Sequence, residues 1–236
     1  MIAPLLEGAM GRMLVVAPHA DDEVLGAGGL IARATQCGWQ VHVRFAVISG
    51  FTSQVRGDGS VTDTRIREAE AALKTLRVAS YEALHIGDDN HLRLDTLAQA
   101  DLVRFVEAGV RAVRPTIAVI PSATHHHQDH RAFAQASLAA LRPAPDGPNP
   151  FVPMVLAAGD TSSGWGVPGN RFAPSTFVDV SDVIGLKLEA LAAYESQLCP
   201  PPHPRSIEGV RAQCAAWGSL VGTAYAEAFE TLRCVF

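Results

Sequence analysis

The stretch Met13-Leu14-Val15-Val16-Ala17-Pro18-His19-Ala20-Asp21-Asp22-Glu23 decides how this chain of 236 residues folds and where its chemistry lies. Its first five residues are apolar and predict a short buried strand. The residues that follow place one imidazole and three carboxylates directly after that strand. Because open α/β sheets bind ligands beyond the carboxyl ends of their strands, the stretch predicts a functional site at this end.

A second cluster of the same chemistry lies far downstream. The apolar run 117–120 is followed by His125-His126-His127-Gln128-Asp129-His130. Histidine and aspartate are ligands that suit zinc, and a spare carboxylate beside them can act as a base. Two such clusters, each after its own strand, predict one composite metal site.

Strand and helix signals alternate along the rest of the chain. This alternation indicates an α/β fold with a Rossmann-like, mostly parallel sheet and helices on both faces. The proline-rich stretch 143–150 predicts an exposed loop rather than a domain boundary, because either half alone would have a thin core. We therefore expect a single domain over 1–236. The expected strands are 13–17, 41–48, 82–86, 116–120, 152–158 and 175–180, and the expected helices are 23–37, 62–78, 95–113, 128–141, 182–196 and 207–232.

The composition excludes several classes of protein. A net charge of −5 without a basic stripe argues against nucleic acid as a partner. No run approaches 18 apolar residues, and the first residues lack the basic and apolar regions of a signal peptide, so neither a membrane partner nor secretion is expected. The four cysteines show no CxxC spacing, which favours reduced thiols in a cytoplasmic protein. A homo-oligomer remains open.

These motifs together resemble the PIG-L/LmbE family of zinc-dependent N-deacetylases. The resemblance rests on the Pro-His-x-Asp-Asp-Glu turn and the later His-x-Asp-His, in this order. Weaker support comes from Arg65-x-x-Glu68, from Lys187 with the 194–197 segment, and from the pattern between Arg211 and Phe229. Ala20, Gln128 and Arg77 depart from the family pattern, but none of them stands at a ligand position.

The resemblance implies roles for six residues. His19, Asp22 and His130 match the ligands of one Zn²⁺ per chain, leaving a position for water as a catalytic zinc requires. Asp21 matches the general base. His127 and Asp129 match a pair in which the carboxylate orients the imidazole toward the developing oxyanion or the leaving nitrogen. Whether Asp21 or His127 protonates the amine stays open, and His126 or His127 could replace His130 as ligand.

Three further positions are expected to bind substrate. Arg65 lies near the start of a helix that follows the polar loop 49–61, and the resemblance favours a substrate contact over a surface charge. Asp89 stands where relatives carry a sugar-binding aspartate, although it also fits a turn. Tyr194, like Gln197, either lines the site or packs its helix.

A dinucleotide site is not expected at Gly26-Ala27-Gly28-Gly29. Ile31 stands where the fingerprint needs a small residue, and the acidic residue about 20 positions on is missing. These glycines instead predict close helix packing near the metal. The loop 160–174 predicts a rim, a lid or an oligomer contact.

The function implied by the resemblance is zinc-dependent hydrolysis of an acetamide on an N-acetylated sugar or aminosugar-derived small molecule, giving acetate and an amine. Two alternatives remain. One is an amidase that removes a larger acyl group from a sugar or thiol conjugate. The other is a non-catalytic zinc-containing binding module, although a structural zinc would more often have four protein ligands.

Overall fold

The computed structural model describes residues 6, 10–52, 59–87, 90, 92–144, 147–161 and 171–235. Within them, a central sheet has the strand order β5-β2-β1-β6-β7-β9-β8. Five neighbours run parallel: β1 (Arg12–His19), β2 (Gln40–Ile48), β5 (Ser80–Ile86), β6 (Ile117–Pro121) and β7 (Met154–Ala158). Strand β9 (Ala226–Cys234) is antiparallel to both β7 and β8 (Thr176–Asp179). The expected α/β class with a mostly parallel sheet is confirmed.

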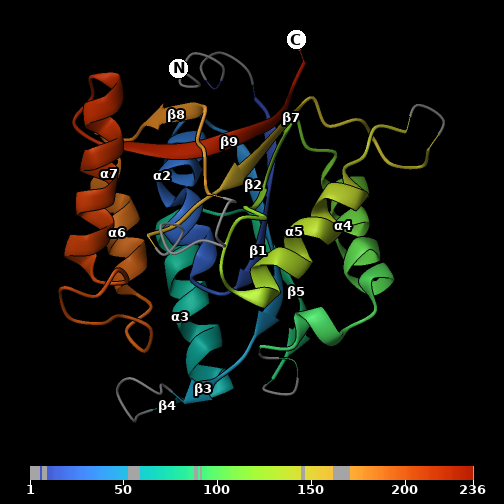
Figure 1. The fold of residues 1–236 in the computed structure, drawn as a ribbon, viewed down its shortest axis with the longest axis horizontal. Coiled ribbons are helices and arrows are strands. Elements are labelled where there is room, and N and C mark those ends of the chain that lie inside the picture. The colour runs from blue at the N-terminus through green and yellow to red at the C-terminus, as the bar shows by residue number, and fades with distance from the viewer. Residues whose placement is uncertain are drawn as a thin grey trace.

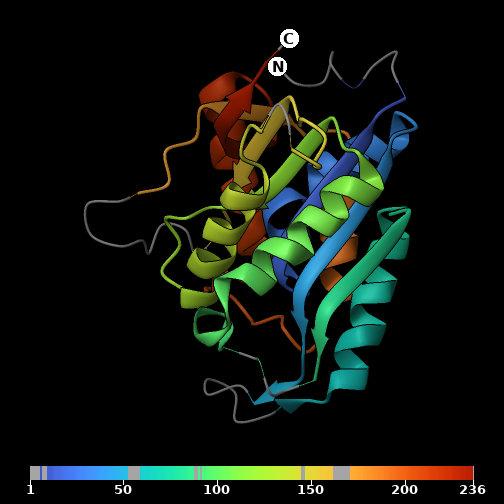
Figure 2. The same ribbon diagram turned by 90° about the vertical axis from the view of Figure 1, so that its right-hand side faces the viewer.

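Helices cover both faces of the sheet, as Figures 1 and 2 show. Helices α4 and α5 lie on one face, and the other face carries α2, α3, α6 and α7. A short 3₁₀ turn and a small two-stranded ladder complete the described elements. Their bounds are α2 (Asp22–Gln36), α3 (Thr62–Thr75), α4 (Gln99–Val113), α5 (Gln128–Ala140), α6 (Ile184–Ala192), α7 (Ile207–Val221), η2 (Leu94–Thr96), β3 (Phe51–Thr52) and β4 (Gly59–Ser60).

Strand β1 joins the two halves of the core. Met13, Val15 and Ala17 face the layer of α2, α3 and α6, while Leu14 and Val16 face α4 and α5. Side chains alternate between the faces of a strand, so a continuous apolar run is what a strand covered on both faces requires. The apolar run 13–17 therefore lies at the centre of the molecule.

The expected helix over 207–232 is wrong. Helix α7 ends at Val221 because Gly222 takes the left-handed conformation, with φ of 77°. Glycine adopts this conformation without the steric cost that other residues meet, so it commonly ends helices. The chain then turns back as β9, whose first four residues are buried in the sheet. The expected helix over 95–113 is also shorter, since η2 precedes α4.

The glycines of α2 allow close packing, as expected. A Cβ on Gly29 would lie 2.6 Å from Val180 Cγ1, and one on Gly26 would lie 3.0 Å from Ala158 Cβ. A buried ion pair meets the helix at the same place. Lys187 Nζ donates to Leu25 O at 2.9 Å and to Glu227 Oε1 at 2.6 Å.

Glu227 also accepts the backbone N–H groups of Gly29 and Leu30, each at 2.7 Å. In a regular helix the Gly29 N–H would bond to Leu25 O. The ion pair therefore supplies an acceptor, Glu227, for the Gly29 N–H and a donor, Lys187, for the Leu25 carbonyl. It ties α2 to both α6 and β9. Within the described part of the chain, no helix is long and apolar enough to cross a lipid bilayer.

Candidate metal centre and active site

The metal-ligand candidates meet where β1 and β6 end. His19 is the last residue of β1, Asp22 opens α2, and His130 lies in the first turn of α5, which follows β6. Strand β1 lies between β2 and β6, so the connections that leave these strands diverge at this edge. Such a switch point is where open α/β sheets bind ligands.

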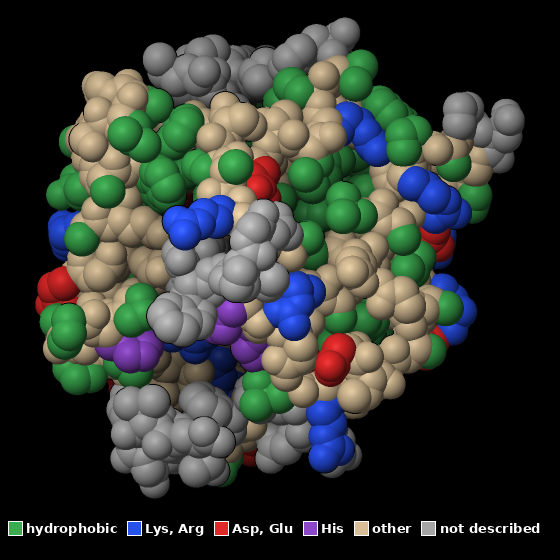
Figure 3. All heavy atoms as spheres, viewed as in Figure 1, with side chains coloured by type: hydrophobic (Ala, Val, Ile, Leu, Met, Phe, Trp, Pro, Cys, Tyr) green, Lys and Arg blue, Asp and Glu red, His purple; other side chains and the backbone are tan. Residues whose placement is uncertain are grey.

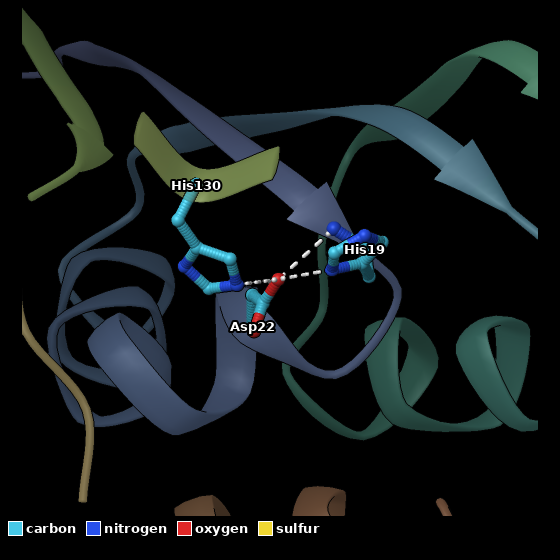
Figure 4. A group of neighbouring side chains, drawn as sticks. All are labelled: His19, Asp22 and His130. Carbon is cyan, nitrogen blue, oxygen red and sulfur yellow. Dashed lines mark hydrogen bonds and ion pairs between the residues drawn. The ribbon is translucent and has the colours of Figure 1, made fainter. Parts of the chain in front are cut away.

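Asp22 lies between the two histidines, as Figure 4 shows. Its Oδ2 is 3.3 Å from His19 Nδ1 and 3.3 Å from His130 Nε2, and it also accepts the backbone N–H of His19 at 3.0 Å. Burial would raise the pKa of Asp22, but His130 and His19 hold it well below its usual range. The Asp22 carboxylate and the imidazoles of His19 and His130 thus converge on one position.

The donor set fits a divalent cation. The candidate ligand atoms of His19, Asp22 and His130 all lie within 4.8 Å of one another. Asp22 Oδ1 and His130 Nε2 are buried without a hydrogen-bond partner among the described residues. Since buried polar atoms are nearly always hydrogen-bonded or coordinated, the two atoms are suited to a metal ion. Two imidazoles and one carboxylate are ligands typical of catalytic zinc.

His130 is the histidine of the second cluster that reaches Asp22, and His126 is exposed. His125 is buried, stacks on His130 with ring centroids 4.0 Å apart, and has its Nε2 3.4 Å from Asp160 Oδ1. The sequence did not single out Asp160 as a site residue. Asp160 follows the end of β7, so its position beside the metal candidates depends on the register of β7 against β6.

Asp129 is bonded to a different histidine from the one expected. Its Oδ2 lies 2.9 Å from His19 Nε2, and its Oδ1 accepts the Leu94 N–H at 3.0 Å. The expected partner was His127. Burial lowers the pKa of His19, but its hydrogen bonds to Asp129 and Asp22 outweigh burial and raise the pKa to about 9. The arrangement matches a ligand histidine whose second nitrogen is held by a carboxylate.

His127 lies beside this group as a neutral donor. Its Nδ1 accepts the backbone N–H of Asp129 at 3.1 Å, so the proton of the neutral ring is on Nε2. Burial, His19 and His130 lower the pKa of His127 to about 3. The ring lines an open cavity, where its Nε2–H can donate to an oxygen.

Asp21 is held in an unusual backbone conformation at the start of α2. Its φ of 126° lies in a region that non-glycine residues rarely occupy. Such strain persists where surrounding contacts enforce it. The Asp21 N–H donates to Glu23 Oε2 at 3.0 Å, and Arg65 donates to the carbonyl of Ala20. Burial raises the pKa of Asp21, while the nearby Arg205 opposes that rise.

Tyr194 does not occupy the expected substrate position. It is fully buried, and its hydroxyl donates to Glu23 Oε1 at 2.5 Å. Burial raises the pKa of Glu23 to about 7. Tyr194 therefore supports the turn of Asp21 through Glu23, and its ring packs against Arg65, whose Cζ lies 5.4 Å from the ring centroid.

Arg65 does line the cavity, but both of its terminal nitrogens already donate to groups of the protein. It is 4% exposed, and besides the Ala20 carbonyl it binds Glu68 Oε2 at 3.1 Å. Glu68 also accepts the backbone N–H and the hydroxyl of Ser196, each at 2.7 Å. Arg65 thus links α3 to the turn that holds the site. Asp89 and most of the loop 160–174 lie outside the described residues.

An open cavity lies beside the metal candidates, and His19 and Asp21 both line it. Figure 3 shows a hollow bordered by histidine side chains, with Lys or Arg side chains inside it. Sequence reasoning missed Arg205, which comes from the segment between α6 and α7 and bears no motif. The cavity is lined by His19, Ala20, Asp21, Val47, Ser49, Arg65, Leu92, His127, Gln197 and Arg205.

Known proteins resemble this chain over most of its length. A diacetylchitobiose deacetylase from Thermococcus kodakarensis is 26% identical over 95% of this chain and 84% of its own length. A 1D-myo-inositol 2-acetamido-2-deoxy-alpha-D-glucopyranoside deacetylase from Rhodococcus jostii is 29% identical, covering 81% of this chain and 83% of its own length. A conserved protein from Thermus thermophilus superposes with a TM-score of 0.74 at 28% identity, over 96% of this chain and 97% of that one.

The family comparison covers both histidine and carboxylate clusters. Residues 14–141 match the family described as PIG-L: GlcNAc-PI de-N-acetylase. This span runs from β1 through α5 and contains His19, Asp22 and His130. Because the match extends over more than half of the chain, the protein belongs to the PIG-L family of GlcNAc-PI de-N-acetylases.

Proposed function

We propose that this protein is a zinc-dependent N-deacetylase that hydrolyses the acetamide of an N-acetylated sugar or aminosugar-derived small molecule. The observation that carries the proposal is the meeting of His19, Asp22 and His130 beside the cavity that Asp21 and His127 line. The relatives act on diacetylchitobiose and on an N-acetylglucosaminyl inositol, by their names. Their substrates share an acetamido sugar, which fits a small-molecule partner here.

We assign one zinc ion per chain to His19, Asp22 and His130. Zinc with three protein ligands polarises a carbonyl and lowers the pKa of water, which is the chemistry that amide hydrolysis needs. Asp129 would hold the Nε2–H of His19, so that His19 Nδ1 faces the metal position. Residues 1–236 form the domain that carries this site.

The chain's own residues supply the proton transfers. Water adds to the acetamide carbonyl as Asp21 accepts its proton, and the Nε2–H of His127 donates to the carbonyl oxygen as that oxygen gains negative charge. When the C–N bond breaks, Asp21 returns the proton to the nitrogen. We favour Asp21 over His127 for this last step because a neutral imidazole is a poor acid. The products are acetate and a free amine.

The other residues act around this centre. Arg65 borders the cavity and Asp89 stays a predicted sugar contact, whereas Tyr194 supports the turn through Glu23. The four cysteines are free, as reduced thiols in a cytoplasmic protein would be, and the cytoplasmic location stays a prediction.

A screen for acetate release tests the proposal. Zinc-loaded protein is incubated with N-acetylglucosamine, N,N'-diacetylchitobiose, N-acetylglucosaminyl glycosides and N-butanoylglucosamine, and the released carboxylic acid and free amine are quantified. The control is the zinc-loaded Asp21→Asn variant. We expect equal amounts of both products from at least one substrate with the wild type. Release no greater than that of the Asp21→Asn variant across the panel would contradict a deacetylase, and activity confined to longer acyl groups would show an amidase instead.

A further inference from the structure

Arg205 lies next to Asp21, the proposed general base. It belongs to the segment between α6 and α7, which contains no metal-ligand candidate. Its backbone N–H donates to His203 Nδ1 at 3.1 Å. The next residue, Ser206, caps α7 by accepting the Gly209 N–H at 2.9 Å. The backbone on both sides of Arg205 is therefore anchored. Its side chain projects to the cavity wall, where it is 30% exposed.

The guanidinium of Arg205 forms an ion pair with the carboxylate of Asp21. Arg205 Nη1 lies 3.3 Å from Asp21 Oδ2, and the Asp21 side chain is 3% exposed. Glu23 and Arg65 contact the turn at backbone atoms, the Asp21 N–H and the Ala20 carbonyl. Among the described residues, Arg205 is the cation within ion-pair distance of the carboxylate itself. The backbone contacts thus fix the turn, while Arg205 contacts the group that takes the proton.

We propose that Arg205 is a positioning residue for Asp21: it orients the carboxylate at the cavity wall and keeps it facing the water that attacks the acetamide. This inference rests on the proposed function, in which Asp21 is the base. The ion pair supports it, because Arg205 Nη1 lies 3.3 Å from Oδ2 of a carboxylate side chain that is only 3% exposed. Asp21 also raises the pKa of Arg205, which keeps the guanidinium charged.

The geometry separates this role from metal binding. Arg205 precedes α7, whereas the three metal-ligand candidates belong to β1, α2 and α5. No metal-ligand candidate among the described residues makes an ion pair with Arg205. The loss of Arg205 should therefore disturb the base and leave the zinc in place.

Two Arg205 variants and a matched control test the proposal. Arg205→Gln removes the charge, and Arg205→Lys keeps it without the planar fork. Arg211→Gln, an exposed arginine on α7, is the control. We expect Arg205→Gln to lower kcat about 10- to 100-fold with KM changed less than about threefold, since misplacing a catalytic group costs up to about 100-fold. Zinc content should stay at the wild-type value. Arg205→Lys should recover part of kcat, and Arg211→Gln should match the wild type.

A double-mutant cycle with Asp21→Asn decides whether Arg205 acts through Asp21. In the Asp21→Asn background, Arg205→Gln should lower kcat less than about twofold, because the carboxylate that it positions is gone. A full kcat loss in that background would overturn the proposal. So would a rise in KM with kcat unchanged, which would make Arg205 a substrate contact.

A thermal cycle on the same four proteins needs no substrate. The Tm loss of the double variant should be smaller than the sum of the two single losses, because removing either partner already breaks the pair. Additive Tm losses would overturn the pairing even if no acetate were released from any substrate. Conversely, the Tm loss of the double variant could be smaller than the sum of the single losses while the wild type releases no acetate. That result would contradict the deacetylase assignment and still support the Arg205–Asp21 ion pair. The two failures are therefore distinguishable.

Discussion

Asp21 and Asp22 are adjacent in sequence but face different partners. Asp22 turns toward His19 and His130, whereas Asp21 turns toward Arg205 and the cavity. Asp21 has a positive φ of 126° in the turn where the two side chains diverge. Neighbouring carboxylates can therefore serve a metal and a proton transfer separately.

Replacing each of these carboxylates by its amide should separate the two roles. Asp21→Asn should keep zinc but lose about 10²- to 10⁴-fold in kcat, the usual contribution of a general base. Asp22→Asn should lose zinc and activity together, because a neutral amide is a weak ligand. Metal analysis and acetate release on both variants measure this. Zinc loss in Asp21→Asn with retention in Asp22→Asn would mean that the roles are reversed.

Asp129→Asn should weaken zinc binding about 10- to 100-fold, the usual cost of losing a carboxylate behind a ligand histidine. The reason is that Asp129 Oδ2 holds His19 Nε2. A competition titration with a chromogenic chelator measures the affinity. Asp95→Asn, on an exposed residue of η2, is the control. Unchanged zinc affinity with a lower kcat would instead support the original expectation that Asp129 orients His127.

Some of these residue contacts were predictable from the sequence and others were not. The meeting of His19 with His130 follows from strand order, because parallel strands end at one edge of the sheet. The bond between Asp129 and His19 joins residues 110 positions apart and depends on which way a carboxylate turns within α5. Arg205 was missed because it carries no motif and follows no strand.

At the scale of elements, the Lys187–Glu227 pair holds α2 against α6 and β9. Both side chains are almost fully buried. Burial alone would lower the pKa of Lys187, but Glu227 raises it, so the lysine remains charged. Because Glu227 binds two N–H groups of α2, the pair supports the helix that begins with Asp22.

Lys187→Met should therefore lower the free energy of unfolding by about 3–5 kcal/mol, the usual cost of leaving a buried charge unpaired. Urea unfolding followed by circular dichroism measures the change. Arg104→Gln breaks an exposed pair with Asp101 and should cost at most about 1 kcal/mol. Equal losses in the two variants would contradict a structural role for the buried pair.

Among the elements, the sequence prediction was wrong in the C-terminal part of the chain, where one expected helix is a helix followed by a strand. Periodic apolar residues continue from α7 into β9, so residues 207–232 indicated one helix. Gly222 marks the break, but a glycine inside a helical pattern is ambiguous until its φ is known. The parallel strands were easier to predict, because strands buried on both faces are almost continuously apolar.

At the scale of the whole molecule, the metal candidates connect both faces of the sheet. Asp22 belongs to α2 on one face and His130 to α5 on the other, with His19 on β1 between them. A metal held by all three therefore stabilises the packing of both helices at once. The sequence predicted the α/β class because strand and helix signals alternate along the chain. The same alternation places the segments that follow β1 and β6 at one edge of the sheet.

Removing the metal should lower the thermal stability of the entire domain. A ligand present at about 100 times its Kd stabilises the folded state by about 2.7 kcal/mol. Dialysis against a chelator should therefore lower Tm, and added zinc should restore it. The His130→Ala variant should melt at the same temperature with or without chelator. A chelator-induced fall in Tm in His130→Ala equal to that of the wild type would assign the metal elsewhere.

Strand β9 is the last of the described strands in sequence, yet it lies between β7 and β8. A ribosome releases the chain from its N-terminus, so β7 keeps an unpaired edge, and Lys187 lacks its carboxylate, until residues 226–234 have emerged. Every metal-ligand candidate is translated before that moment. A prematurely terminated chain would thus contain the full set of ligand candidates and still expose the unpaired edge of β7, which favours aggregation.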